Sequence, residues 1–322
     1  MIRNIAQLLY WGTHYSGANK AWIKYLLKKR DVKLMLNYHH IVKDEAFVQN
    51  LTHGYSHRLS AFDAQMAYLS ENFKVNTDID DYNSITITFD DGAKSNFTNA
   101  HGLLEKYGLK AWFFLNDRHL DTSPQRTLWV DEMYEWLSHA KTGSYAFGSF
   151  SKDLTNDNLF EFEQHLFDHL VHNFDELDAF ISFIRSNTHF DLNSNADRFA
   201  PMSLDELAHM KAYGHELGFH TRNHYMLGSI SSEVLANELV IPDYLKNVIN
   251  RSEVLSIPFG IPKTVNSKVF QEIFDAGYKT ILLNEVRSKG ADIKGRINVV
   301  NSSELPKISS YLARWPLFLF ER

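Results

Sequence analysis

Two carboxylates and two imidazoles stand in this chain where they could share a metal ion. Asp90 and Asp91 end an apolar, β-branched stretch and are followed by Gly92, and three residues separate His220 from His224. Adjacent carboxylates are costly to hold close without a compensating cation, so one can bind metal while the other stays free as a base. Two imidazoles four residues apart can chelate one ion. Asp91, His220 and His224 would leave an open position for water, which suits hydrolysis.

Neither pattern is specific by itself. Asp-Gly is a common turn dipeptide, so Asp90 to Gly92 fits a plain turn about as well as a site. The His-x-x-x-His spacing occurs three times among sixteen histidines: at His53 and His57, at His165 and His169, and at His220 and His224. The first pair precedes a predicted helix, and the second falls in a charged helical stretch and is expected on a solvated face. Only His220 follows a predicted strand directly, so it would project at the same rim as Asp91.

Two further polar turns follow predicted strands. Tyr38, His39 and His40 end the apolar stretch 33–42, and an apolar strand at 253–257 runs into Pro258, Phe259 and Gly260. A lone histidine at a strand end is more often structural, but two in succession favour a site modestly. The Pro-containing turn is more simply a strand exit.

Strands and helices alternate along the chain in a way that would bring these strand ends together. Strands are predicted near 33–42, 84–89, 110–115, 216–219, 253–257, 279–283 and 296–300, and helices at 61–73, 95–107, 204–213, 231–247 and 266–275. Alternating strands and helices indicate a parallel sheet. About seven strands with intervening helices predict an α/β fold with a barrel-like sheet, and the site would lie at the carboxyl ends of its strands.

We expect one catalytic domain over residues 1–322, with an N-terminal helix within 1–30 and a helical insertion at about 150–200. The stretch 152–188 is rich in Asp, Glu, Asn and Phe, and it could cap the site. The N-terminal helix would pack on the domain or touch a membrane surface. No signal peptide is evident, so a cytoplasmic location, peripheral to a membrane or not, is expected.

Net charge and the lack of cysteine exclude several classes of partner and of catalytic site. The net charge of −6 gives no basic excess for reading phosphates, so no nucleic-acid partner is expected. The 322 residues contain no cysteine, which excludes disulfides, thiolate catalysis and Cys zinc sites. Any metal must therefore bind to His, Asp or Glu.

In combination these motifs resemble the polysaccharide deacetylases with NodB homology, carbohydrate esterase family 4. Ile87 to Gly92 is similar to the family's T-F-D-D-G motif, and the following helix and strand continue the likeness through Leu115. Gly214 to His224 is similar to its G-H-E-I-G-x-H-T and H-[ST]-x-x-H segments. Ile257 to Gly260 is similar to its P-[YF]-G turn. The likeness covers roughly residues 33–300, interrupted by the insertion.

The resemblance implies a role for each matched residue. Asp91, His220 and His224 would hold a divalent metal, commonly zinc, and Asp90 would take a proton from the attacking water. The backbone N–H of Phe259 would help to stabilise the oxyanion. The family's fold is a distorted barrel of about seven strands.

Two family features are missing. Ser256 and Ile257 stand where the family has an arginine, and no histidine follows His224 to protonate the leaving amine. Members with an N-terminal Tyr-His segment supply that histidine from the start of the chain, which makes His39 the candidate acid and His40 the alternative.

Two more residues fall where relatives have functional ones. Arg296 stands where an arginine could orient the base carboxylate. Trp129 stands where relatives have an aromatic residue near the cleft, although core packing explains it equally well.

The expected activity is metal-assisted removal of an acetyl group, N-acetyl rather than O-acetyl if His39 is the acid. The acid matters more for an amide, because an expelled amine anion is a very poor leaving group. The substrate would be an acetylated amino sugar, free, polymeric or lipid-linked. The rivals are another C–N hydrolase on this fold, such as a deformylase or cyclic-amide hydrolase, and a pseudoenzyme that binds glycan.

Overall fold

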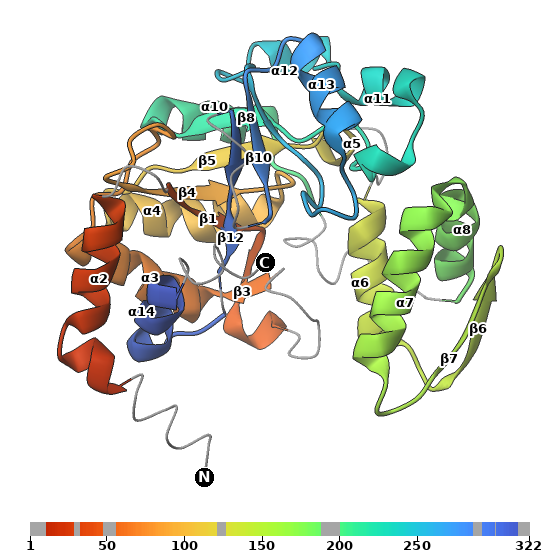
Figure 1. The fold of residues 1–322 in the computed structure, drawn as a ribbon, viewed down its shortest axis with the longest axis horizontal. Coiled ribbons are helices and arrows are strands. Elements are labelled where there is room, and N and C mark those ends of the chain that lie inside the picture. Colours follow the sequence, from red (N-terminus) through yellow and green to blue (C-terminus); the bar gives the residue numbers. More distant parts are fainter. Residues whose placement is uncertain are drawn as a thin grey trace.

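A sheet of parallel strands forms the centre of the structure, a computed structural model that describes residues 11–28, 33–47, 56–120, 127–187, 200–285, 292–299 and 301–314. The strand order is β11-β10-β9-β8-β5-β4-β1-β12. In chain order these strands are β1 (Leu34–Tyr38), β4 (Ile85–Phe89), β5 (Trp112–Leu115), β8 (Glu216–Phe219), β9 (Val254–Ser256), β10 (Thr280–Leu283), β11 (Ile293–Gly295) and β12 (Ile297–Asn298). Figure 1 shows helices arranged around this sheet.

The last strand closes the sheet into a barrel. β11 pairs with β10 and β12 pairs with β1, and only Arg296 separates β11 from β12. One short run of chain therefore joins the two ends of the sheet. The expected α/β barrel is confirmed. It has eight strands, or seven if β11 and β12 are counted as one strand interrupted at Arg296.

The barrel interior is filled in two layers. Because side chains alternate along a strand, every second residue of each strand faces inward. A lower apolar layer contains Met35, Trp112, Phe114, Val254 and Leu282. An alanine Cβ at Gly218 would stand 2.5 Å from the Phe114 ring, so the glycine makes room for it. Nearer the carboxyl ends of the strands, buried Asn37, Thr88, Ser256 and Arg296 form a polar layer.

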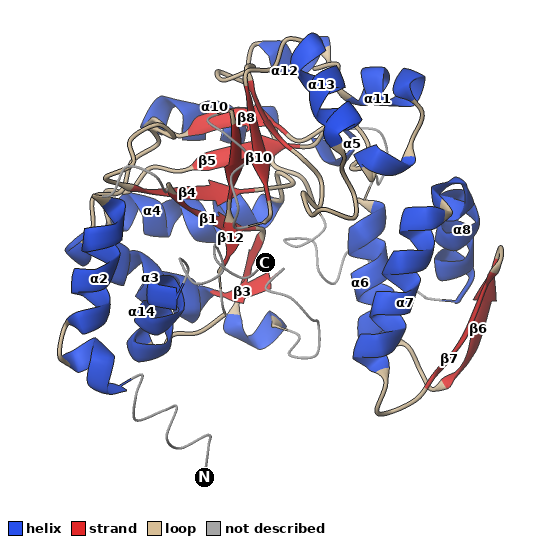
Figure 2. Ribbon diagram, in the orientation of Figure 1, coloured by secondary structure: helices blue, strands red, loops and turns tan. Residues whose placement is uncertain are grey.

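Helices cover the outside of the barrel and bury the other face of each strand (Figure 2). They include α3 (Leu59–Asn72), the π-helix η2 (Asn96–His101) with α4 (Gly102–Lys106), α10 (Leu204–Tyr213) and α13 (Ser267–Asp275). The prediction of one continuous helix at 231–247 is wrong. It is divided into α11 (Ser232–Glu238) and α12 (Asp243–Lys246), because Pro242 lacks the N–H that a continuous helix needs.

The insertion is larger than expected and is not wholly helical. It comprises α6 (Trp129–His139), the hairpin of β6 (Gly143–Phe147) and β7 (Phe150–Leu154), α7 (Leu159–His172), η3 (Phe174–Glu176) and α8 (Leu177–Asn187). Tyr145, Phe147, Phe150 and Phe162 contribute to an aromatic core of its own. β6 and α6 lie before the predicted bounds of about 150–200, and the alternation of Tyr145 with Phe147 has the period of a strand. In Figure 1 the insertion forms a separate lobe beside the barrel.

The expected N-terminal helix is described in part. α2 (Ala18–Leu27) packs against α14 (Leu305–Arg314), and residues 1–10 lie outside the described part of the chain. Among the described residues, no helix combines the length and apolar character needed to cross a bilayer.

Candidate metal centre

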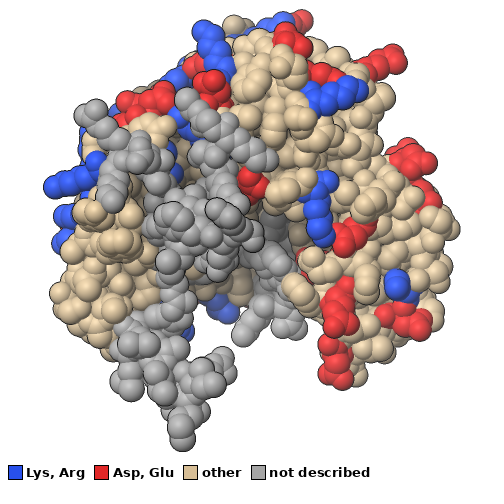
Figure 3. Space-filling model, in the orientation of Figure 1, with Lys and Arg blue, Asp and Glu red and all other residues tan. Residues whose placement is uncertain are grey.

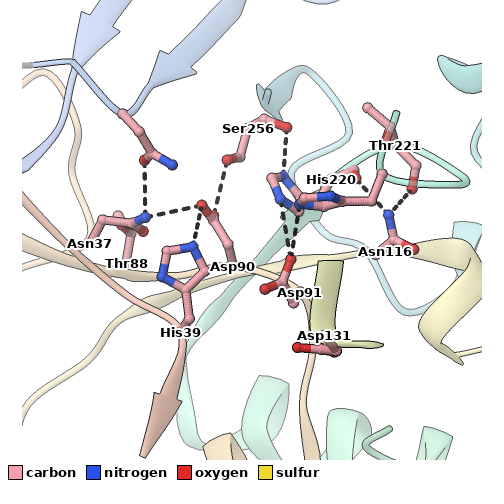
Figure 4. A network of polar contacts seen from close by, with 12 residues as sticks. Asn37, His39, Thr88, Asp90, Asp91, Asn116, Asp131, His220, Thr221 and Ser256 are labelled. Carbon is pink, nitrogen blue, oxygen red and sulfur yellow. Dashed lines mark hydrogen bonds and ion pairs between the residues drawn. The ribbon is translucent and has the colours of Figure 1, made fainter. Parts of the chain in front are cut away.

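Functional side chains gather where the parallel strands end (Figure 4). His39 follows β1, Asp90 and Asp91 follow β4, and His220 follows β8. The backbone N–H of Asp90 donates to the Tyr38 carbonyl, so the ends of β1 and β4 are level. In parallel barrels this rim is where sites are built.

Three ligand atoms converge at the rim. The Nε2 atoms of His220 and His224 each lie 3.4 Å from Oδ1 of Asp91. All three side chains are buried. Ligands ~2.0–2.2 Å from a tetrahedral zinc ion would stand roughly 3.3 Å from one another. The donor set and its spacing therefore fit a divalent metal without rearrangement.

Asp91 is unusual for a buried carboxylate. Neither of its oxygens has a hydrogen-bond partner within the described part of the chain. Burial alone would raise the pKa of Asp91, but contact with His220 and the proximity of His224 lower it well below its usual range. Burial would likewise lower the pKa of His220, and the Asp90 and Asp91 carboxylates raise it overall. The pocket thus favours positive charge beside Asp91, which a metal ion would supply.

Neighbouring groups orient the two imidazoles. Nδ1 of His220 lies 2.8 Å from the Ser256 carbonyl oxygen, which can only accept, so Nδ1 carries a proton and Nε2 is the nitrogen that would bind a metal. The indole Nε1 of Trp129 donates to the His224 carbonyl at 3.0 Å. The amide of Asn116 donates to the carbonyls of His220 and Thr221 at 2.9 and 3.1 Å. Such outer contacts set ligand geometry in metal sites.

Asp90 is held as an anion by four donors. Arg296 donates to both carboxylate oxygens at 2.8 and 2.7 Å, Ser256 Oγ donates at 2.9 Å and Asn37 Nδ2 at 3.1 Å. Burial would raise the pKa of Asp90, but the Arg296 guanidinium holds it well below its usual range. This carboxylate is therefore fixed in position and ionised.

His39 lies between Asp90 and the open part of the site. Its Nε2 is 3.9 Å from Oδ2 of Asp90. Burial lowers the pKa of His39, and the nearby Asp91 and Asp90 oppose that change only in part. The ring is therefore mainly neutral near pH 7.

The alternative acid, His40, faces elsewhere. It is fully buried, and its Nε2 lies 3.2 Å from Oδ1 of Asp131, which is also fully buried. Asp131 belongs to α6, so this contact joins the insertion to the barrel rim.

A cavity of about 300 Å³ opens over the three converging ligands. The barrel side contributes His39, His220, His224, Phe259, Ile261, Lys263, Asn284 and Asn298, and the insertion contributes Val130, Met133, Tyr134, Glu163, Gln164 and Phe167. The wall is largely apolar with a few polar groups, as in small-molecule sites. The insertion therefore forms one side of the cavity, as the proposed cap would.

Backbone strain is concentrated at this site. Among the described residues, the non-glycine residues with positive φ are Asp91, Thr221, His224 and Phe259, at 76°, 64°, 58° and 60°. Such conformations are costly and persist where surrounding contacts enforce them, commonly at functional sites. Here they occur at two candidate metal ligands, Asp91 and His224, and at Phe259, which lines the cavity.

The structure brings together most of the residues expected from sequence. Asp90, Asp91, His39, His220, His224 and Phe259 meet at one rim. Arg296, Trp129 and His40 lie beneath the cavity surface and contact Asp90, His224 and Asp131 respectively. Sequence reasoning missed Asn37 and Asp131, although a polar residue inside the apolar stretch Leu34 to Tyr38 was a signal for the first.

A second group, His101, Glu105 and His209, also has metal-like spacing. The Ala111 N–H donates to Nδ1 of His215, so the proton of His215 lies on Nε2, 3.0 Å from Nδ1 of His101. Burial lowers the pKa of His215 to about 3, which keeps it neutral. His101 must then carry its own proton on Nε2, the nitrogen that faces Glu105. This group is set up for hydrogen bonding rather than for a metal.

Comparison with known proteins agrees with this geometry. Residues 77–281 match the polysaccharide deacetylase family. No curated protein sequence matches the chain.

Similar solved structures are deacetylases of low sequence identity. They include Streptococcus pyogenes deacetylase PplD in complex with acetate, with 17% identity, a TM-score of 0.52, and coverage of 88% of this chain and 97% of that one. IcaB from Ammonifex degensii has 14% identity, a TM-score of 0.52 and the same coverages. A de-N-acetylase from Aggregatibacter actinomycetemcomitans has 12% identity, a TM-score of 0.54, and covers 87% and 99%. At this identity they show a shared fold.

Proposed function

Because this chain belongs to the polysaccharide deacetylase family, we propose that it removes an N-acetyl group from an amino sugar with the help of a divalent metal, zinc in the first instance. The observation that carries the proposal is the arrangement of two carboxylates with separate surroundings. Asp91 faces two imidazole nitrogens and accepts no hydrogen bond from the described residues, whereas Asp90 accepts four. The first suits a metal ligand and the second a fixed anion beside it.

Asp91, His220 and His224 would hold the metal. When bound there, a divalent ion supplies Lewis acidity that polarises the acetyl carbonyl and makes water more acidic. All-nitrogen-and-oxygen ligation by two His and one Asp is typical of catalytic zinc, and the described residues add no fourth protein ligand to this group.

Asp90 and His39 would move one proton from water to the leaving nitrogen. The negative charge of the Asp90 carboxylate would favour removal of a proton from the water. Because the pKa of Asp90 is low, Asp90 would not retain that proton. His39, 3.9 Å away and neutral beforehand, can take the proton and release it to the nitrogen as the C–N bond breaks. The protons balance, because amide hydrolysis moves one proton from the attacking water to the leaving amine.

The turn after β9 would bind the developing oxyanion. Phe259 has φ 60°, is followed by Gly260 at 53°, and lines the cavity beside His224. We assign its backbone N–H as the oxyanion donor. Preorganised donors of this kind lower the barrier because they need no reorientation during the reaction.

The cavity suits a sugar, whether free, at the end of a polymer or lipid-linked. Tyr134, Phe167 and Phe259 offer rings to the apolar face of a hexose, and Asn284 and Asn298 offer hydrogen bonds to its hydroxyl groups. A cytoplasmic location stays a prediction from the sequence alone.

Acetate release from N-acetylhexosamine oligomers, measured beside bound metal per chain, tests the proposal. We expect stoichiometric metal and turnover that Asp90→Asn abolishes. Release of formate, or opening of a cyclic amide, with no acetate would assign the site to another C–N hydrolase. Glycan binding without metal and without acetate release would identify a pseudoenzyme and overturn the proposal.

A further inference from the structure

An aromatic face near the N-terminus stands exposed to solvent. Trp11, Tyr15, Trp22 and Tyr25 are 42%, 70%, 46% and 48% exposed. Trp11 lies 5.5 Å from Tyr15, and Trp22 stacks on Tyr25 at 5.5 Å, measured between ring centroids. The two ring pairs lie on consecutive helical stretches, 11–15 and α2 (Ala18–Leu27), and together they are here named the aromatic face. Scattered exposed rings are normal, but a cluster of this kind marks an interaction surface.

The aromatic face cannot turn inward, because the opposite side of α2 is already packed. Ile23, Leu26 and Leu27 are buried in the main core. Asn19 donates to Ser309 and Ser310 of α14, at 3.1 and 3.0 Å. The indole of Trp22 donates to the Ala313 carbonyl, which fixes the orientation of that ring while its face stays exposed. The rings are therefore held outward by the fold.

Positive charge accompanies the aromatic face. Residues 1–30 contain six basic residues and no Asp or Glu, in a chain with a net charge of −6. Lys24 of α2 and Lys28, the residue that caps its C-terminus, are exposed and lie on either side of Tyr25 in sequence. No acidic residue of α2 competes for them.

The acidic side chains gather elsewhere. Residues 127–187 of the insertion contain eleven Asp and Glu and three Lys and Arg. Figure 3 shows the acidic side chains along the right side, over the insertion, and basic side chains at the left edge. The molecule therefore has a basic end at α2 and an acidic end at the insertion.

We propose that the aromatic face and its lysines bind the surface of an anionic lipid bilayer. Trp and Tyr favour the headgroup region, where an apolar ring and a polar edge are both satisfied. Lysines beside them add attraction to anionic lipids, and their stems lie along apolar surface with the amine in water. The charge distribution would also turn the acidic insertion away from the bilayer. This proposal does not depend on the proposed activity.

Sedimentation with vesicles tests it, with phosphatidylcholine alone compared with a phosphatidylcholine and phosphatidylglycerol mixture. We expect the full chain to bind the anionic vesicles, with weaker binding as salt rises because exposed charges are screened over ~8 Å at physiological ionic strength. Replacing Lys20, Lys24 and Lys28 together by Glu should weaken partitioning by about 10²-fold. Trp22→Ser with Tyr25→Ser should weaken vesicle binding and reduce the shift of tryptophan fluorescence on vesicle addition, with Trp11 giving the remaining shift.

Lys246→Glu with Lys268→Glu provides a charge-reversal control elsewhere on the surface, because these exposed lysines lie on α12 and α13. This variant should bind as the parent does. Every variant should hydrolyse a soluble acetylated sugar as the parent does, so loss of vesicle binding cannot be loss of fold. Absence of anionic-vesicle binding, or equal binding by the triple Lys→Glu variant, would overturn the proposal. A dimer that Trp22→Ser disrupts, without vesicle binding, would assign the face to a second copy and also overturn it.

Discussion

Arg296, which directly precedes β12, donates to both carboxylate oxygens of Asp90 at 2.8 and 2.7 Å, and neither side chain is exposed. Removing one member of a buried ion pair leaves the other charge uncompensated, at a cost of ~3–5 kcal/mol. We therefore expect Arg296→Gln to lower the free energy of unfolding by about that amount. Urea unfolding of the metal-free protein measures it.

The double variant Arg296→Gln with Asp90→Asn supplies the control. It should recover much of the stability, because no unpaired charge then remains inside the barrel. If Arg296→Gln unfolds at the same urea concentration as the parent, the guanidinium does not compensate Asp90.

Removing the His39 imidazole should affect amides more than esters. The leaving amine needs a proton and an alkoxide needs it less, so His39→Ala should reduce amide kcat by about 10²-fold or more and ester kcat much less. Matched N-acetyl and O-acetyl substrates make the comparison. His165→Ala, an exposed histidine of the insertion, should change neither rate. Equal retention of both activities in His39→Ala would remove His39 from the mechanism.

Metal should stabilise the parent protein and not a ligand variant. A ligand at 100 times its Kd that binds only the folded state adds ~2.7 kcal/mol to the free energy of unfolding. His224→Ala should abolish this gain and lower the metal content measured after dialysis. His209→Ala, in the second histidine group, should leave both unchanged. A loss of metal in His209→Ala would contradict the proton assignment given to His101.

Trp129 should tune metal affinity from outside the ligand set. Its indole N–H binds the His224 carbonyl, and outer contacts of this type are worth ~10–100-fold in metal affinity. We expect Trp129→Phe, which keeps a ring but loses the donor, to weaken zinc binding by about tenfold. Competition with a chelating dye measures the affinity. Trp136→Phe, within the insertion core, is the control, and an equal effect of both variants would indicate a general packing defect.

Acid should destabilise the fold partly through His215. Because burial lowers its pKa to about 3, the folded state binds fewer protons than the unfolded state between that value and ~6.5. The contribution of His215 to stability is therefore present above ~6.5 and is lost as the pH falls toward 3. Unfolding free energy should depend less steeply on pH over this window in His215→Gln. An unchanged slope would show that the ring is not held neutral.

Much of the barrel and half of the site could be predicted because the signals are local. Asp91 and His220 follow short apolar strands directly, and the rim position follows from that alone. The contact of Arg296 with Asp90 joins residues 206 positions apart, which no spacing reveals without a resemblance. Asp131 was missed for the same reason, because its partner His40 belongs to another element. The hairpin of β6 and β7 was missed because strands of five residues show only a short alternation, here at Tyr145 and Phe147.

Arg296 both links the two strands that close the barrel and binds the carboxylate of Asp90. β11 pairs with β10 and β12 with β1, and Arg296 lies between them. The first barrel strand, β1, pairs with the last, β12, and the counter-ion of Asp90 directly precedes β12. A chain that ends before residue 296 would therefore retain Asp91, His220 and His224, the proposed metal ligands, but would lack the guanidinium that holds Asp90 in place.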